Sequence, residues 1–126
     1  MTRTVKCLQG RGVAHLHERF IMIFAVDFDG TFAADPETFR QVIMLLRRRG
    51  HTAVIVTGRS DEGEFGREVR ETIASVFPPD KQAINQPPPI VFAGLLWKRE
   101  AAEMAGYSVD VWMDDLPEYI AQQNIP

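Results

Sequence analysis

From residue 21 onward, short apolar runs alternate with stretches that are apolar only at the spacing of one helix face. An apolar run with almost no interruption is typical of a strand buried on both faces of a parallel sheet. The runs predict strands over residues 21–26, 52–56, 90–92 and 109–113. The stretches between and after them predict helices over residues 36–49, 62–76, 98–104 and 117–122.

The predicted helices carry signals for their ends and their buried faces. Asp35 suits an N-cap, and Pro36 suits the first helical position after it. Gly50 ends the same helix after three arginines. Their positive charges interact favourably with the negative, C-terminal end of the helix dipole. In the helix over 62–76, the residues expected to face the core are Phe65, Val69, Ile73 and Val76.

Strands that alternate with helices of this length predict an α/β fold built from βαβ units. We expect a three-layer, Rossmann-like open parallel sheet with helices on both faces, over residues 20–126. Residues 83–84 could add a separate short strand pairing. Residues 1–19 are basic without a clear period, which leaves open a basic arm, a short strand or a poorly ordered N-terminal extension; we favour the extension.

Composition narrows the class of protein. The chain has 126 residues, enough for one domain, and no apolar run approaches the roughly 20 residues of a membrane helix. The 17 acidic and 14 basic residues give a net charge of −3, which argues against a dedicated nucleic-acid binder. The single cysteine, Cys7, excludes an intrachain disulfide and favours a reducing, cytoplasmic location.

Polar residues follow three of the four predicted strands. In chain order these residues are Asp27, Asp29, Thr57, Gly58, Asp114 and Asp115. Ligands of open parallel sheets bind beyond the carboxyl ends of the strands, so we expect these residues to converge on one site.

The residue types in this set indicate phosphoryl transfer. Clustered carboxylates repel one another, and a hard divalent cation such as Mg²⁺ relieves that repulsion. The Thr57 hydroxyl, the backbone N–H groups beside Gly30 and Gly58, and a nearby lysine are the donors that a phosphoryl group requires. A carboxylate can also attack phosphorus and form an aspartyl-phosphate.

The chain resembles the haloacid dehalogenase (HAD) superfamily of Mg²⁺-dependent phosphohydrolases at four places. One apolar strand leads into Asp27-x-Asp29-Gly30-Thr31, and a second ends in Thr57-Gly58-Arg59. Lys98 opens a helix, and the last strand ends in Asp114-Asp115. The resemblance spans residues 21–120 and implies a HAD-like core that hydrolyses phosphomonoesters through an aspartyl-phosphate intermediate.

The resemblance also implies a role for each matched residue. Asp27 would be the nucleophile and a metal ligand; Asp29 would be the general acid and base and place its backbone carbonyl on the metal. Thr57 would hydrogen-bond the transferring phosphoryl group, and Lys98 would neutralise that group and orient Asp27. The implied ligands of a Mg²⁺ cofactor are Asp27, Asp29, Asp114 and Asp115. The implied phosphate-binding residues are Phe28, Asp29, Thr57, Gly58 and Lys98.

Neither place where HAD enzymes commonly carry a cap domain has room for one. Residues 32–35 lead straight into a helix, and one helix, a loop and one strand use up residues 60–97. We therefore expect a capless enzyme whose open site is covered by a large substrate, a neighbouring subunit of a homo-oligomer, or the N-terminal arm. Because specificity in the family comes largely from the cap, the phosphate ester, small or macromolecular, stays unidentified.

Other interpretations remain open. The chain could be a HAD-like binding or regulatory module without useful turnover. It could also be a phosphoryl-receiver domain, although the acid of a receiver follows a middle strand and no acid follows residues 90–92. Arg59 could contact substrate or lie at the surface, and Lys81 and Arg99 compete with Lys98 for the phosphate-binding role. The residues interpreted as packing aromatics are Trp97, Tyr107 and Trp112.

Overall fold

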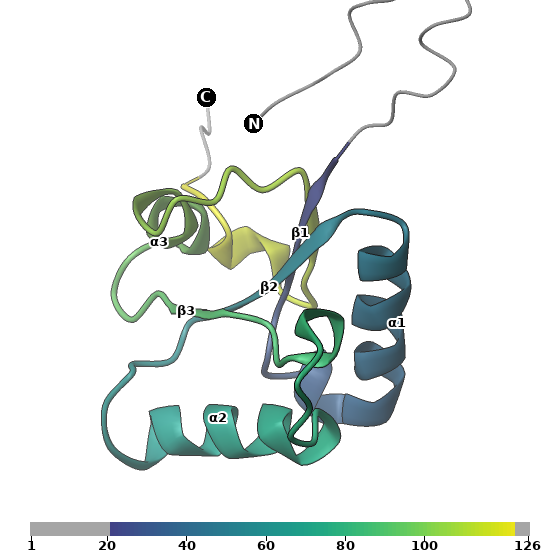
Figure 1. The fold of residues 1–126 in the computed structure, drawn as a ribbon. Helices are drawn as coiled ribbons and strands as arrows, with labels where there is room; N and C mark the ends of the chain where they lie inside the picture. The colour runs from purple at the N-terminus through teal and green to yellow at the C-terminus, as the bar shows by residue number, and fades with distance from the viewer. Residues whose placement is uncertain (1–20, 123–126) are drawn as a thin grey trace, which may run out of the picture.

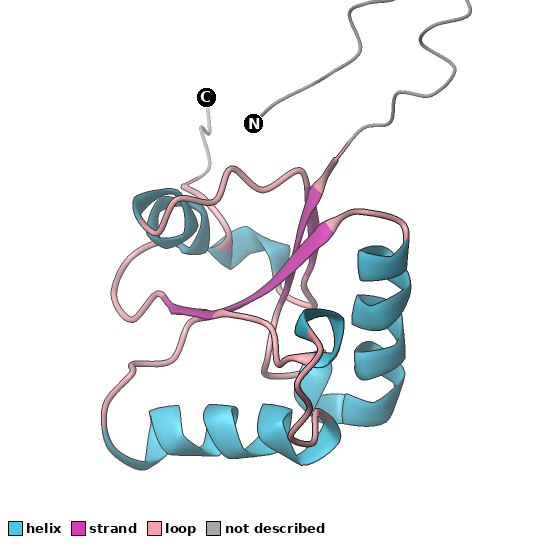
Figure 2. Ribbon diagram, viewed as in Figure 1, coloured by secondary structure: helices cyan, strands magenta, loops and turns pink. Residues whose placement is uncertain are grey.

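Four parallel strands form the centre of the structure, a computed structural model that describes residues 21–122 (Figures 1 and 2). The strands are β1 (Ile23–Val26), β2 (Thr52–Thr57), β3 (Ile90–Phe92) and β4 (Val111–Met113). They lie in the order β3-β2-β1-β4, so β1 and β2 are interior. Val26 at the end of β1 lies beside Ile55 of β2 and Met113 of β4. The predicted α/β class with a parallel sheet is confirmed.

Helices cover both faces of this sheet. The α-helices are α1 (Pro36–Arg48), α2 (Gly63–Val76) and α3 (Lys98–Met104), and the 3₁₀ helices are η3 (Phe32–Ala34), η4 (Ala83–Asn85) and η5 (Pro117–Tyr119). Because side chains of a strand alternate between faces, Ile55 of β2 packs with α1 and α2, whereas its neighbours Val54 and Val56 pack with α3. The result is three layers, with α1 and α2 on one face and α3 on the other (Figure 1).

The sequence signals at helix α1 are confirmed. Asp35 is its N-cap, and the carboxylate of Asp35 accepts a hydrogen bond from the backbone N–H of Thr38 at 3.2 Å. Pro36 opens the helix, and Gly50 follows its end with a positive φ of 89° that favours glycine. The other predicted strands and α-helices agree with the observed ones to within two residues at each end, except the last helix.

Three local predictions are wrong. Residues 83–84 belong to η4 and do not pair with the sheet, because the Arg47 side chain binds the backbone carbonyls of Ile84 and Gln86 and holds this segment against α1. The predicted helix over 117–122 is the single turn η5, because the chain then bends to let the Ile120 carbonyl accept a hydrogen bond from the Arg99 N–H.

The third error concerns the buried face of α2. Phe65 is exposed, and Gly66 is buried in its place, one position along the helix. A Cβ atom at Gly66 would collide with the backbone carbonyl of Asp61, so α2 approaches the preceding loop more closely than a phenylalanine on this face would allow. Val69 and Ile73 face the core as predicted.

The predicted extension over residues 1–19 lies outside the described residues. Within residues 21–122, no helix has both the length and the apolar character needed to cross a membrane.

Candidate active site

The carboxyl ends of β1 and β4 meet where the order of the sheet reverses. The chain runs outward from β1 through β2 to β3 with α1 and α2 on one face, then returns through α3 to β4 on the other side of β1. Such a reversal leaves a crevice beyond the strand ends, the usual place for a ligand in this architecture. Asp27 follows β1 at this point, and Asp114 follows β4.

Lys98 bridges these two acids. Its Nζ atom donates to Asp27 Oδ1 at 2.7 Å and to Asp114 Oδ2 at 2.6 Å. All three side chains are at least nine-tenths buried. Lys98 reaches the acids because it is the first residue of α3, which begins beside the ends of the strands. The alternative lysine, Lys81, is exposed, as is Arg99. A buried ammonium between two carboxylates neutralises only part of their charge.

Asp27 is held by both its backbone and its side chain. Its N–H donates to the Met113 carbonyl at 2.9 Å, which continues the pairing of β1 with β4 beyond the last strand residue. The pKa of its carboxyl is raised from the ordinary 3.8 to about 6. Burial is the largest cause, Asp115 and Asp114 act in the same direction, and Lys98 opposes them. For Lys98, burial favours the neutral amine, but the bonds to Asp114 and Asp27 outweigh it and raise the pKa.

Asp115 completes a group of three carboxylates. Asp27, Asp114 and Asp115 each offer an oxygen atom, and these oxygens lie within 4.8 Å of one another. Hard divalent cations prefer such oxygen ligands, and the excess negative charge around Lys98 fits a cation, so the donor set suits Mg²⁺. Gly30 makes room for Asp115: its φ is 78°, and a Cβ atom there would collide with the Asp115 carboxylate. Asp29, the fourth implied ligand, was expected to contribute its backbone carbonyl, and its side chain is not in this group.

Asp29 is held by an arginine instead. Arg59 donates to both carboxylate oxygens of Asp29, from Nε at 2.9 Å and from Nη2 at 2.7 Å. The same guanidinium binds Glu68 of α2 at 2.6 Å and lies over the Phe28 ring, 5.1 Å from its centroid. These contacts raise the pKa of Arg59, chiefly through the bond to Asp29. Arg59 is thus a fixed part of this site, a role that the sequence left open.

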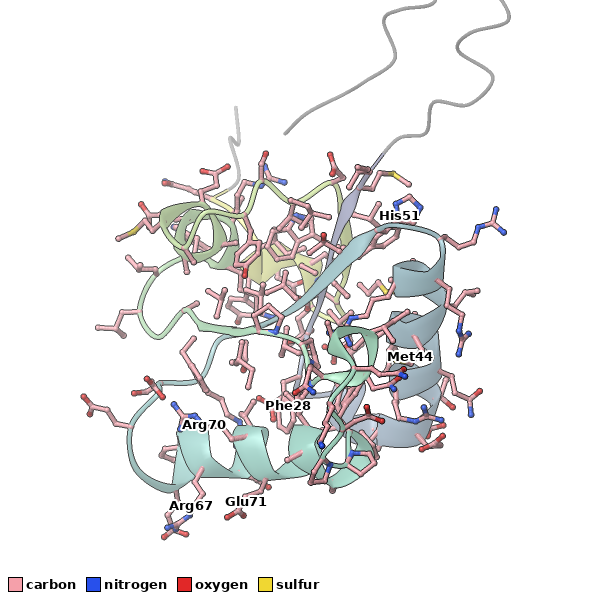
Figure 3. The ribbon with its side chains drawn as sticks, in the orientation of Figure 1. Phe28, Met44, His51, Arg67, Arg70 and Glu71 are labelled. Carbon is pink, nitrogen blue, oxygen red and sulfur yellow. The ribbon has the colours of Figure 1, made fainter. Side chains whose placement is uncertain are left out.

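Of the remaining predicted phosphate-binding residues, Gly58 lines the cavity at this edge of the sheet, whereas Thr57 and Phe28 are buried and do not line it. Thr57 is fully buried, and its Oγ1 atom accepts the backbone N–H of Arg59 at 3.2 Å. Gly58 follows it directly and lines the cavity beside Lys98. The side chain of Phe28 lies in the core between the sheet and α2, so only its backbone can serve a phosphate (Figure 3).

Asp27, Asp29 and Lys98 line a cavity of about 460 Å³. Its lining consists of Asp27, Asp29, Gly58, Gly94, Leu95, Leu96, Trp97, Lys98, Leu116 and Tyr119. The large apolar and aromatic residues of this lining were missed in the sequence, and Trp97 is 40% exposed rather than packed. Their position could have been noticed, because Leu95, Leu96 and Trp97 directly precede Lys98 and Leu116 directly follows Asp115.

The raised pKa of Asp27 predicts an unusual pH dependence of stability in metal-free protein. Its folded pKa is about 6 and its ordinary value is 3.8, so between these values the folded state binds a proton that the unfolded state does not. The free energy of unfolding should therefore increase as the pH falls from 7.5 to 5, by more than in an Asp27→Asn variant. Urea unfolding in EDTA across this range measures the difference, and parallel curves for the two proteins would contradict it.

Comparison of the chain with protein-family models, curated proteins and solved structures found no match.

Proposed function

We propose that this chain is a Mg²⁺-dependent phosphomonoester hydrolase of the HAD type, which acts through an aspartyl-phosphate on Asp27. The observation that carries the proposal is the buried Asp27–Lys98–Asp114 bridge, of which Asp27 and Lys98 line a cavity and which has Asp115 beside it. Three carboxylates and one ammonium leave a net charge of −2, which a divalent cation would balance. A phosphate substrate would bind to the same cation.

Asp27 is the nucleophile in this proposal. Lys98 donates to Asp27 Oδ1, and the Thr31 hydroxyl donates to Oδ2 over a longer distance of 3.5 Å. A carboxylate oxygen of Asp27 attacks phosphorus, and the bond from phosphorus to the leaving alcohol breaks. Water then attacks the aspartyl-phosphate, which releases inorganic phosphate and restores the Asp27 carboxylate. Lys98 holds Asp27 in place and neutralises charge on the phosphoryl oxygens.

Asp29 moves the proton in both steps. It lines the same cavity as Asp27, and its side chain is about half exposed. Carrying a proton, it donates to the leaving alcohol in the first step; in the second it accepts a proton from the attacking water. Arg59 holds the ionised Asp29 carboxylate by two hydrogen bonds, which gives Asp29 a defined position for accepting the proton of the attacking water. One of these two bonds must open when Asp29 carries the proton of the first step.

Mg²⁺, held by Asp27, Asp114 and Asp115, would offset the repulsion among these carboxylates and stabilise negative charge on the phosphoryl oxygens. Three neighbours keep these ligands in place. Lys98 and the Leu116 N–H both bind the Asp114 carboxylate, and the absence of a side chain at Gly30 gives Asp115 its space.

Hydrolysis of a generic phosphomonoester should depend on a divalent cation. Dialysis of the protein against EDTA should reduce the turnover of p-nitrophenyl phosphate to background, and added Mg²⁺ should restore it. The release of p-nitrophenol, followed with and without the metal, measures this effect. Full turnover in EDTA would exclude the proposed role of the carboxylate cluster.

Acetyl phosphate separates this enzyme from a phosphoryl-receiver domain. Strand order does not separate them, because the strand that ends at Asp27 is itself interior to the sheet. Rapid release of inorganic phosphate from acetyl phosphate supports the hydrolase, whereas a phosphoprotein that persists supports a receiver. A protein without activity on any ester would instead be a binding or regulatory module.

A further inference from the structure

Apolar side chains are concentrated around the cavity that holds Asp27 and Lys98. Ten large apolar or aromatic side chains of residues 21–122 are exposed, and five of them line this one cavity. The five, here called the apolar rim, are Leu95, Leu96, Trp97, Leu116 and Tyr119. Scattered exposed apolar residues need no explanation, but a cluster beside a candidate active site indicates that something apolar binds there.

Hydrogen bonds hold the first half of the rim in place. Leu95, Leu96 and Trp97 lie in the loop that joins β3 to α3 (Figure 1). The start of this loop is tied to the end of β2: the Ala93 N–H donates to the Thr57 carbonyl at 2.8 Å. The Leu96 N–H then closes a turn on the Ala93 carbonyl at 2.9 Å. Leu95 is therefore fully exposed on a backbone that is already ordered.

The second half of the rim is tied to the acids. The Leu116 N–H donates to Asp114 Oδ1 at 2.9 Å, and the Tyr119 N–H donates to the Leu116 carbonyl at 3.1 Å. The carboxylate that binds Lys98 thus also positions Leu116. A rim that is ordered before a ligand arrives loses little conformational entropy when the ligand binds.

The cavity offers polar and apolar partners in different places. The charged residues of its lining are Asp27, Asp29 and Lys98, and the proposed mechanism uses all three. Apart from two glycines, the rest of the lining is the apolar rim, whose polar side-chain atoms are the Trp97 N–H and the Tyr119 hydroxyl. A sugar or another polyol would lose water at this rim and gain few hydrogen bonds in return.

We propose that the substrate of this site is a small phosphomonoester whose leaving group is apolar and uncharged, an alkyl or aryl alcohol that packs against the apolar rim. This inference rests on the function proposed above and specifies its substrate class. A cavity of about 460 Å³ falls within the size range of small-molecule sites, which combine apolar walls with a few polar groups. Binding of the leaving group at the rim would place the phosphate toward Lys98.

A series of primary alkyl phosphates, from ethyl to octyl, tests this inference. Their leaving alcohols have nearly equal intrinsic reactivity, so differences in kcat/KM along the series report contacts with the apolar chain. Each methylene group that enters the rim should raise kcat/KM by about twofold to fourfold. Glycerol phosphate, a polar ester of similar size to the short members, should be a poorer substrate than butyl phosphate.

Variants of the rim locate the effect. Leu95→Ser and Leu116→Ser should each flatten the rise of kcat/KM with chain length. Leu45→Ser is the matched control, because Leu45 is about as exposed as Leu116 but lies on α1, outside the cavity lining. Equal kcat/KM along the series, or a rise that Leu45→Ser reduces as much as the rim variants do, would overturn the proposal.

Two further measurements distinguish a substrate-binding rim from a dimer interface and from a site without turnover. If the rim instead binds a second copy of the chain, light scattering should show a dimer that Leu95→Ser converts to monomer, and that result would overturn the proposal.

If the protein hydrolyses no ester, the proposed function fails, and calorimetry with Asp27→Asn protein tests the rim by itself. Tighter binding of hexyl phosphate than of glycerol phosphate would then support the rim as a site for apolar groups, and equal binding would overturn it.

Discussion

Replacing Asp27 with Asn should reduce the hydrolysis of p-nitrophenyl phosphate by about 10³-fold or more, because the amide cannot attack phosphorus as a carboxylate does. The substitution keeps the size of the side chain. It also removes a buried charge whose pKa is raised to about 6, chiefly by burial. The variant should therefore fold, and the loss of kcat at saturating Mg²⁺ reports chemistry rather than unfolding. Steady-state kinetics with a circular dichroism check of the fold measure both.

Asp80→Asn provides a matched control for this experiment. Asp80 lies in the exposed loop before η4, where its carboxylate accepts the Gln82 N–H, a bond that an asparagine side chain can also accept. Its activity should equal that of the wild type. Undiminished turnover by Asp27→Asn would remove the nucleophile from the proposed mechanism, whereas equal losses in both variants would indicate a general effect on the protein.

Replacing Lys98 with Met should lower the free energy of unfolding in EDTA by about 3–5 kcal/mol, because it leaves two buried carboxylates without their shared cation. The present contacts of 2.7 Å to Asp27 and 2.6 Å to Asp114 would be lost together. Mg²⁺ should restore part of the stability, since it brings positive charge back to the same oxygens. Hydrolysis should stay low even with Mg²⁺, because the phosphoryl group has lost its ammonium partner. Urea unfolding with and without Mg²⁺ measures the stability.

A double variant keeps this prediction testable if Lys98→Met does not fold. Lys98→Met combined with Asp27→Asn removes one buried charge of each sign, so its stability loss should be clearly smaller than that of Lys98→Met alone. Lys81→Met is the control: Lys81 is the exposed lysine of the loop before η4, and its replacement should change stability little. Equal stability of Lys98→Met and Lys81→Met would show that the buried bridge contributes nothing.

Much of the fold follows from local features of the sequence. The runs that became β1 to β4 are apolar over several consecutive residues, and the cap at Asp35 acts on an N–H three residues away. Such signals involve neighbours in the chain and can be recognised without a tertiary structure. The failures at residues 83–84 and at Phe65 have the opposite cause. There the outcome depends on a side chain of α1 and on how closely α2 approaches the preceding loop.

The candidate site shows the same division. The sequence by itself determined that acids follow β1 and β4, and the carboxyl ends of parallel strands share one edge, so their convergence could be predicted. It did not decide whether Lys98, Lys81 or Arg99 meets them. The tertiary structure places Lys98 between Asp27 and Asp114 and leaves the other two exposed, because α3 begins directly beside these strand ends.

Only the tertiary structure decided what surrounds the acids. The hydrogen bonds of Arg59 to Asp29 and Glu68 connect the loops after β1 and β2 with α2. The apolar rim combines residues of the loop before α3 with residues that follow β4. Both features depend on contacts between segments that are far apart in the chain. No local pattern of hydrophobic and polar residues encodes such contacts. The sequence therefore determined the sheet and the acids at its edge, whereas packing between elements decided the partners of those acids and the apolar lining of the cavity.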